Sequence, residues 1–144
     1  MKKLFFILIV LSTIFCGYSQ TKSMQGAWKV VSLEHRSGDS LLYKLDNVNI
    51  GNELKIWSKK YFNFVGRYKT DTTFYDNFGS GTYTLNGNHY EENLIDNSDR
   101  NFAGKKIRIL LERKNDTIIQ IWPADANWNI IKKNYYIQKL VKAD

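Results

Sequence analysis

Hydrophobic and polar residues alternate along most of the chain after residue 26, in short segments rich in Val, Ile, Tyr, Phe, Trp and Thr that Gly, Asn and Asp interrupt. Alternation of this kind is typical of β-strands with one buried face. No segment has a sustained helical period, and parallel sheets, which need crossover helices, are therefore excluded. About eight strands are predicted, at residues 27–36, 53–58, 60–67, 80–86, 88–96, 105–114, 117–122 and 134–142.

Two tight turns predict antiparallel hairpins. Asn86-Gly87 lies between residues 82–85 and 89–92, and both turn residues tolerate positive φ. Asn115-Asp116 lies between two alternating segments, and the first of them places Ile107, Ile109 and Leu111 on one face and Lys106, Arg108 and Glu112 on the other. An even number of short antiparallel strands favours an all-β, up-and-down barrel, with a β-sandwich as the alternative.

Three connections are expected to be longer, at residues 37–52, 68–79 and 123–133. Long loops on a rigid scaffold are where binding residues often concentrate. Within the first, residues 40–45 are expected to form either a short helix or an extra strand that packs against the barrel and covers one end of it.

Residues 1–19 have the pattern of a removable signal peptide, with Lys2 and Lys3 followed by a mostly apolar segment and by small residues at Gly17 and Ser19. One alternative is a membrane anchor, although the segment is shorter than the roughly 20 apolar residues that span a bilayer. Another is lipidation of Cys16, which the bulky Phe15 before it disfavours. We therefore expect one domain, residues 20–144, in a secreted or periplasmic cell-envelope protein.

Composition narrows the chemistry. The 21 basic and 14 acidic residues give a net charge of +7, and removal of Lys2 and Lys3 lowers it by two. The basic residues fall in pairs beside strand ends rather than in long runs, so nucleic acid is not an expected partner. Cys16 is the only cysteine, and its removal with the signal leaves no disulfide and no cysteine metal ligand.

The tripeptide Gly26-Ala27-Trp28 at the head of the first strand resembles the start of lipocalins and their calycin relatives. In the last strand, Lys139 takes the place of the Arg that lipocalins lay over the Trp. Together with residues 55–58, 61–66 and 79–83, the pattern is similar to that of small exported bacterial lipocalin-like domain proteins. The resemblance implies a barrel floor of Gly26, Trp28 and Lys139, and an interior that is either filled or holds one small ligand. It implies no reaction.

The sequence contains no recognisable arrangement of catalytic or metal-binding residues. His35 and His89 lie on separate predicted strands without a third ligand. Glu91 and Glu92 face opposite sides of one strand, and the one that faces inward would need a partner such as Arg108 or Arg67. We expect no catalytic residue, no metal and no cofactor.

The many aromatic residues point to a ligand cavity more than to a catalytic site, because Tyr and Trp can line such a cavity. Aromatic residues are, however, also enriched in strands whatever the function. Polar side chains on central strands are the candidate ligand-binding residues: Tyr83, Arg108, Gln120, Tyr136 and Gln138. The leading hypothesis is a non-catalytic binding protein for a small hydrophobic or amphipathic ligand. The alternative is an envelope or extracellular interaction protein with a filled barrel, which binds a protein or glycan through loops and exposes Trp128 and Phe78.

Overall fold

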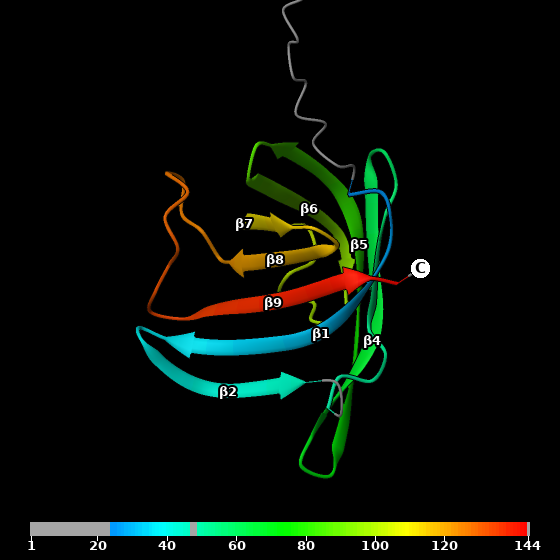
Figure 1. Ribbon diagram of the computed structural model, residues 1–144, viewed down its shortest axis with the longest axis vertical. Helices are drawn as coiled ribbons and strands as arrows, with labels where there is room; N and C mark the ends of the chain where they lie inside the picture. Colours follow the sequence, from blue (N-terminus) through cyan, green and yellow to red (C-terminus); the bar gives the residue numbers. More distant parts are fainter. Residues whose placement is uncertain (1–23, 47–48, 144) are drawn as a thin grey trace, which may run out of the picture.

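The computed structural model describes residues 24–46 and 49–143. In this part of the chain all regular structure is β-sheet, which confirms the all-β prediction (Figure 1). The strands are β1 (Gly26–Ser37), β2 (Ser40–Asp46), β3 (Leu54–Trp57), β4 (Tyr61–Thr70), β5 (Thr73–Asn86), β6 (His89–Asn97), β7 (Lys106–Lys114), β8 (Thr117–Trp122) and β9 (Tyr135–Lys142).

The sheet closes into an eight-stranded antiparallel barrel with up-and-down connectivity, as predicted. Its order is β2-β1-β3-β4-β5-β6-β7-β8-β9, and pairing of β1 with β9 closes it. The other edge of β1 is shared, because its first residues pair with β3 and its later residues pair with β2. The strand β2 is therefore a ninth strand beside the closed eight.

Two of the three connections expected to be long contain strand. Residues 40–46 form β2, the extra-strand alternative for this segment. Residues 68–79 form no loop, because β4 and β5 continue to a tight turn after Thr70. Cross-strand pairs such as Tyr68 with Tyr75 extend that hairpin, and Asp71 takes the positive φ of 51° that the turn needs.

Both predicted hairpins form. In the β5–β6 hairpin Asn86 pairs with His89, so the turn is centred one residue later than predicted, on Gly87-Asn88, and Gly87 has a φ of +60°. The β7–β8 turn uses Asn115-Asp116 as predicted. The inner face of β7 is also confirmed, since Ile109 and Leu111 are buried and Ile107 packs against the core.

One end of the barrel is closed by an aromatic core around Trp28. This residue is 2% exposed; its Nε1 donates to the Met24 carbonyl at 2.9 Å, and its ring meets Trp57 edge-to-face at 6.4 Å. The basic group over Trp28 is Lys142, whose Nζ lies 5.2 Å from the ring centroid.

The expectation that Lys139 covers Trp28 is therefore corrected. Lys139 is exposed on the outer face, because its neighbours Gln138 and Leu140 are the buried residues of β9 and successive strand residues face opposite sides. Besides Lys142, the guanidinium of Arg113 lies 5.8 Å from the Trp28 ring. Gly26 has a φ of +111°, a backbone conformation that other residues rarely adopt, which favours glycine at this position.

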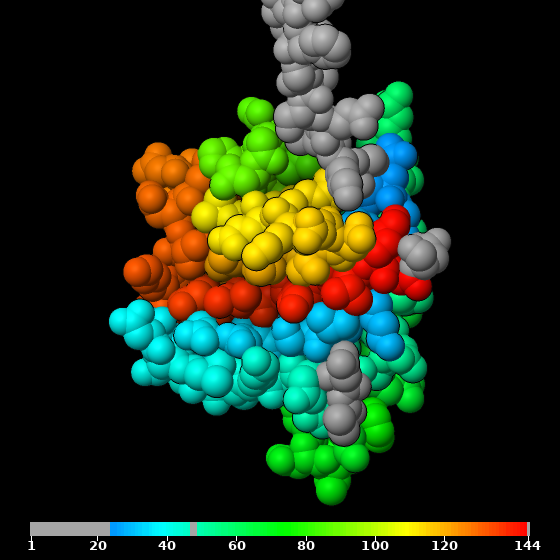
Figure 2. Space-filling model, in the orientation of Figure 1, coloured from blue at the N-terminus to red at the C-terminus, as the bar shows by residue number. Residues whose placement is uncertain are grey.

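At the other end, the turn between β1 and β2 and the loop between β8 and β9 lie side by side (Figures 1 and 2). The amide of Gly38 donates to the Lys132 carbonyl at 2.7 Å, and the Ser37 hydroxyl donates to the Lys133 carbonyl at 2.9 Å. The residue 123–133 connection is thus a loop, as predicted, but one bonded to the barrel.

Among the described residues no helix is long and apolar enough to cross a membrane. The predicted signal peptide, residues 1–19, lies outside the described residues, as does Cys16.

Candidate functional site

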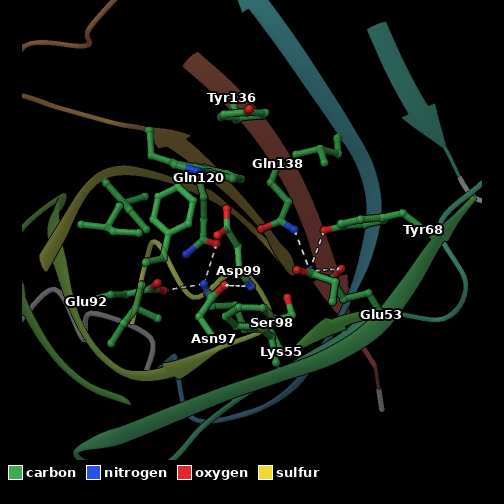
Figure 3. Close-up of a pocket in the computed structure, with 18 of the residues that line it drawn as sticks. Glu53, Lys55, Tyr68, Glu92, Asn97, Ser98, Asp99, Gln120, Tyr136 and Gln138 are labelled. Atoms are coloured by element: carbon green, nitrogen blue, oxygen red, sulfur yellow. Dashed lines mark hydrogen bonds and ion pairs between the residues drawn. The ribbon is translucent and has the colours of Figure 1, made fainter. Parts of the chain in front are cut away.

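A cavity of about 240 Å³ lies inside the barrel, at the end opposite Trp28 (Figure 3). It reaches the surface beside the loop between β6 and β7. Its lining combines aliphatic and aromatic side chains with buried polar ones: Leu33, Tyr43, Glu53, Lys55, Phe64, Tyr68, Asn77, Glu92, Leu94, Asn97, Ser98, Asp99, Phe102, Ile107, Ile109, Gln120, Trp122, Tyr136 and Gln138.

The first polar cluster in the cavity centres on Lys55. This residue of β3 points into the barrel and is only 5% exposed. Its ammonium donates to Glu92 at 2.5 Å and to the Gln120 side-chain oxygen at 3.1 Å. Such a buried cation is tolerated because it is paired, hydrogen-bonded and surrounded by ring faces. Four ring centroids lie 5.3 to 5.7 Å from its Nζ, those of Trp57, Phe62, Phe64 and Tyr90.

This cluster is tied to the closed end of the barrel by a chain of hydrogen bonds. Trp57 Nε1 donates to the Tyr90 hydroxyl at 2.8 Å. Burial is the main cause that raises the pKa of Tyr90, and the charge of Glu92 and a hydrogen bond to it raise that pKa further. Tyr90 is therefore held as a neutral donor to Glu92.

The second polar cluster centres on Glu53, which is 1% exposed. Its carboxylate accepts from Gln138 Nε2 at 3.2 Å and from Asn77 Nδ2 at 2.9 Å, and the Tyr68 hydroxyl also bonds it (Figure 3). Burial raises the pKa of Glu53, while these three hydrogen bonds and the charge of Lys55 partly oppose that shift. These three hydrogen-bonding partners, Gln138, Asn77 and Tyr68, are all neutral.

The position of Glu53 depends on close backbone packing around it. Gly66 of β4 lies against it so closely that an added Cβ would come within 2.5 Å of the Glu53 Cα and 2.8 Å of its Cγ. In addition, the Glu53 carbonyl accepts from the Val30 amide at 2.9 Å. A residue with a side chain at position 66 would displace the carboxylate from its partners.

Gln120 leaves one buried donor without a partner. Its side chain is fully buried, and its Nε2 has no hydrogen-bond partner among the described residues. The amide orientation is fixed by Lys55, because the ammonium needs the Gln120 oxygen as an acceptor and a flipped amide would set two donors against each other. A buried donor left unbonded is costly, and this one belongs to a side chain that lines the cavity.

An aromatic row forms one wall of the cavity mouth, across β8, β9, β1 and β2. Trp122 stacks on Tyr136 with centroids 5.5 Å apart, Tyr136 stacks on His35 at 4.5 Å, and His35 meets Tyr43 at 5.0 Å. The row follows from the register, since His35 is the cross-strand partner of both Tyr136 and Tyr43. It gives one side of the mouth an aromatic wall.

Three of the five predicted ligand-binding residues line this cavity: Gln120, Tyr136 and Gln138. Tyr83 does not; it packs against Tyr90, and its hydroxyl donates to the Ser58 carbonyl at 2.8 Å. Arg108 does not either, because the even-numbered residues of β7 face outward; there its Nε donates to Glu91 at 3.1 Å.

The inward-facing glutamate is Glu92, but its partner is neither of the two arginines proposed from the sequence. Arg108 bonds Glu91 on the outer face, and Arg67 bonds Asp76 at 2.7 Å on an exposed part of the β4–β5 hairpin. The partner is Lys55, which sequence reasoning missed because strand lysines usually face solvent. The available signal was its place two residues before Trp57, because residues two apart in a strand share a face.

Other groups considered from the sequence lie elsewhere. His89 stacks on Trp128 with centroids 4.2 Å apart, and the Arg108 guanidinium lies 6.0 Å from that Trp ring. Phe78 is on β5, not in a loop, and is 44% exposed. In the part of the chain that the structure describes, no group of three or more His, Cys, Asp or Glu residues is arranged to hold a metal ion.

No protein-family model matches the chain, and no curated protein sequence matches it.

Proposed function

We propose that this protein is an exported, non-catalytic, lipocalin-like binding protein that holds a small, partly apolar ligand inside its barrel. The observation that carries the proposal is the cavity of about 240 Å³, which has aromatic and aliphatic walls and a few buried polar groups. Ligand sites in proteins have this composition, in which apolar walls give affinity and a few polar groups give orientation. The volume lies below the range of about 300 to 1,000 Å³ for drug-sized ligands and therefore favours a smaller molecule.

Two features support the lipocalin-like assignment. The barrel has eight antiparallel strands in up-and-down order, and Trp28 of the Gly26-Ala27-Trp28 tripeptide packs into its closed end. Binding is favoured over catalysis by the state of the cavity's ionisable groups, because Lys55 and Glu92 are bonded to each other and are held in place by further hydrogen bonds.

An interaction protein remains the second candidate, on one specific observation. Among the described strands β2 pairs only with β1, and its Leu41 and Leu42 are 49% and 54% exposed. Exposed apolar residues on an edge strand are typical of surfaces that other chains contact. This candidate uses β2 and the loops and does not depend on the cavity.

Native mass spectrometry of the protein purified from its own cell-envelope fraction tests the binding function. We expect a small molecule retained at a stoichiometry of one, which denaturation releases for identification. A protein that is recovered empty and that also fails to bind a solvatochromic dye would overturn the proposal.

A pair of variants in the β6–β7 loop tests whether the cavity is the site. Ser98 lines the cavity, whereas Asn101 of the same loop does not. We expect Ser98→Trp to weaken dye binding at least tenfold by obstructing the mouth, and Asn101→Trp to change it less than twofold. Equal effects of the two variants would place the dye elsewhere.

A further inference from the structure

We infer that the ligand is a small organic amine, whose ammonium group is received by Glu53 and which also carries an oxygen acceptor for Gln120. This inference rests on the proposed binding function and specifies its ligand class. It follows from the charge balance of the cavity, from the unused hydrogen-bonding capacity of Glu53 and Gln120, and from the aromatic row at the mouth.

The cavity has an excess of negative charge. Its ionisable carboxyl and amino groups are Glu53, Glu92, Asp99 and Lys55, which are three carboxylates and one ammonium. The whole chain has the opposite sign, with a net charge of +7. Lys55 does not make the cavity a receptor for anions, because its charge is already paired with Glu92 and its ammonium lies among four rings.

Glu53 is the buried carboxylate that has no ion-pair partner among the described residues of the cavity. A carboxylate offers about four lone-pair sites, and Gln138, Asn77 and Tyr68 occupy three of them. None of these partners carries a positive charge, so burial of the carboxylate is opposed by their dipoles and by the charge of Lys55, which is already paired with Glu92. An ammonium group that enters the cavity would take the fourth site and supply the missing charge.

Other features of the cavity indicate which further groups the ligand carries besides its ammonium. Gln120 Nε2 is a buried donor without a partner among the described residues and is satisfied by a hydroxyl or carbonyl oxygen of the ligand. The row that Trp122, Tyr136 and Tyr43 help to form gives the cavity an aromatic wall, against which the apolar body of the ligand packs. A carboxylic acid of the same size would instead face Glu53 and Asp99 with like charge.

Three probes that differ only in their terminal group test this inference by isothermal titration calorimetry on the wild-type protein. Tyramine carries an amine, 2-(4-hydroxyphenyl)ethanol carries a neutral hydroxyl, and 3-(4-hydroxyphenyl)propionic acid carries a carboxylate. We expect tyramine to bind at least tenfold more tightly than the alcohol, and the acid to bind more weakly than either. Equal affinities, or an order in which the acid is tightest, would overturn the amine assignment.

The Glu53→Gln variant assigns the preference to one carboxylate while it keeps the size of the side chain. We expect it to weaken tyramine binding at least tenfold and to change binding of the alcohol less than threefold. The matched control is Glu91→Gln, which removes a carboxylate from the outer face of the neighbouring wall and should leave both affinities unchanged. If Glu53→Gln does not fold, as judged by near-ultraviolet circular dichroism, the probe order on the wild-type protein decides alone.

The two levels of the proposal fail in different ways. If the alcohol or the acid binds as tightly as tyramine and Ser98→Trp abolishes that binding, the cavity binds ligands but the amine assignment is wrong. If native mass spectrometry recovers a ligand without a basic nitrogen, the outcome is the same. If no probe and no dye binds and the protein is recovered empty, the binding function itself fails.

Discussion

Replacing Lys55 with methionine tests whether the buried ion pair organises the cavity. The Lys55 and Glu92 side chains are 6% and 5% exposed, and 2.5 Å separates their charged atoms. Two unit charges 4 Å apart attract by about 4 kcal/mol at an effective dielectric constant of about 20. Methionine keeps the hydrophobic stem but leaves Glu92 charged and unpaired. We therefore expect a loss of about 3 to 5 kcal/mol in the free energy of unfolding, as for other broken buried pairs.

Urea-induced unfolding followed by tryptophan fluorescence measures this loss, since Trp57 adjoins the pair. Two controls isolate the buried charge. Lys106→Met removes a lysine whose side chain is 66% exposed and which bonds Glu91 on the outer face, and it should cost less than about 1 kcal/mol. The double variant Lys55→Met/Glu92→Gln removes both buried charges and should recover at least about 2 kcal/mol of the loss.

A loss below about 1 kcal/mol for Lys55→Met would contradict a buried ion pair, because a pair of exposed charges would behave in that way. A double variant less stable than the single one would contradict it equally. That result would mean that Glu92 is satisfied by Tyr90 and the surrounding dipoles without the lysine.

Three further predictions concern other parts of the barrel. Trp28→Ala should destabilise the protein by about 3 to 5 kcal/mol through loss of the closed-end core; an unchanged melting temperature would contradict its structural role. Gly66→Ala should cost about 1 to 3 kcal/mol and should weaken dye binding, because its Cβ would displace Glu53; unchanged values of both would show that the backbone adapts. The raised pKa of Glu53 makes its contribution to stability largest below its ordinary value of 4.5 and lost as pH rises through the folded value. Urea titrations from pH 4 upward should therefore find that Glu53→Gln gains stability relative to wild type until the pH passes the folded pKa of Glu53, and that the difference is constant above it; a difference that never changes or that reverses would count against a buried carboxylate at this position.

Local patterning was enough to predict the fold class and most of the strands. The alternation of β7 determined which of its residues face the core, and Asn115-Asp116 determined its turn. Where prediction fell short, tertiary pairing decided the structure. The segment 40–46 becomes a strand because β1 is long enough to pair with β3 and β2 along one edge, and a periodicity read within the segment does not contain that information.

The site was predictable only in part, because side-chain direction depends on register. Gln120, Tyr136 and Gln138 were placed in the cavity lining, but Arg108 was assigned there although the alternation of β7 already placed it outside with Lys106. Glu53 and Lys55 were missed for a different reason. Charged residues are normally exposed, and only the closed barrel shows that both are surrounded by partners from distant strands, such as Gln138 and Glu92.

The two ends of the barrel have different roles: the closed end is a packed core, and the other end gives access to the cavity. Trp57 belongs to the closed-end core and, through Tyr90, to the hydrogen-bonded chain that holds Glu92 and Lys55. Lys55 also bonds the Gln120 amide, so this polar group is fixed before a ligand enters, which lowers the entropic cost of binding. The mouth is built differently, from the aromatic row across β8, β9, β1 and β2 and from the loop between β6 and β7. Changes of ligand specificity should therefore be easiest to obtain at the mouth, whereas changes at Lys55 or Glu92 should be felt first as a loss of stability.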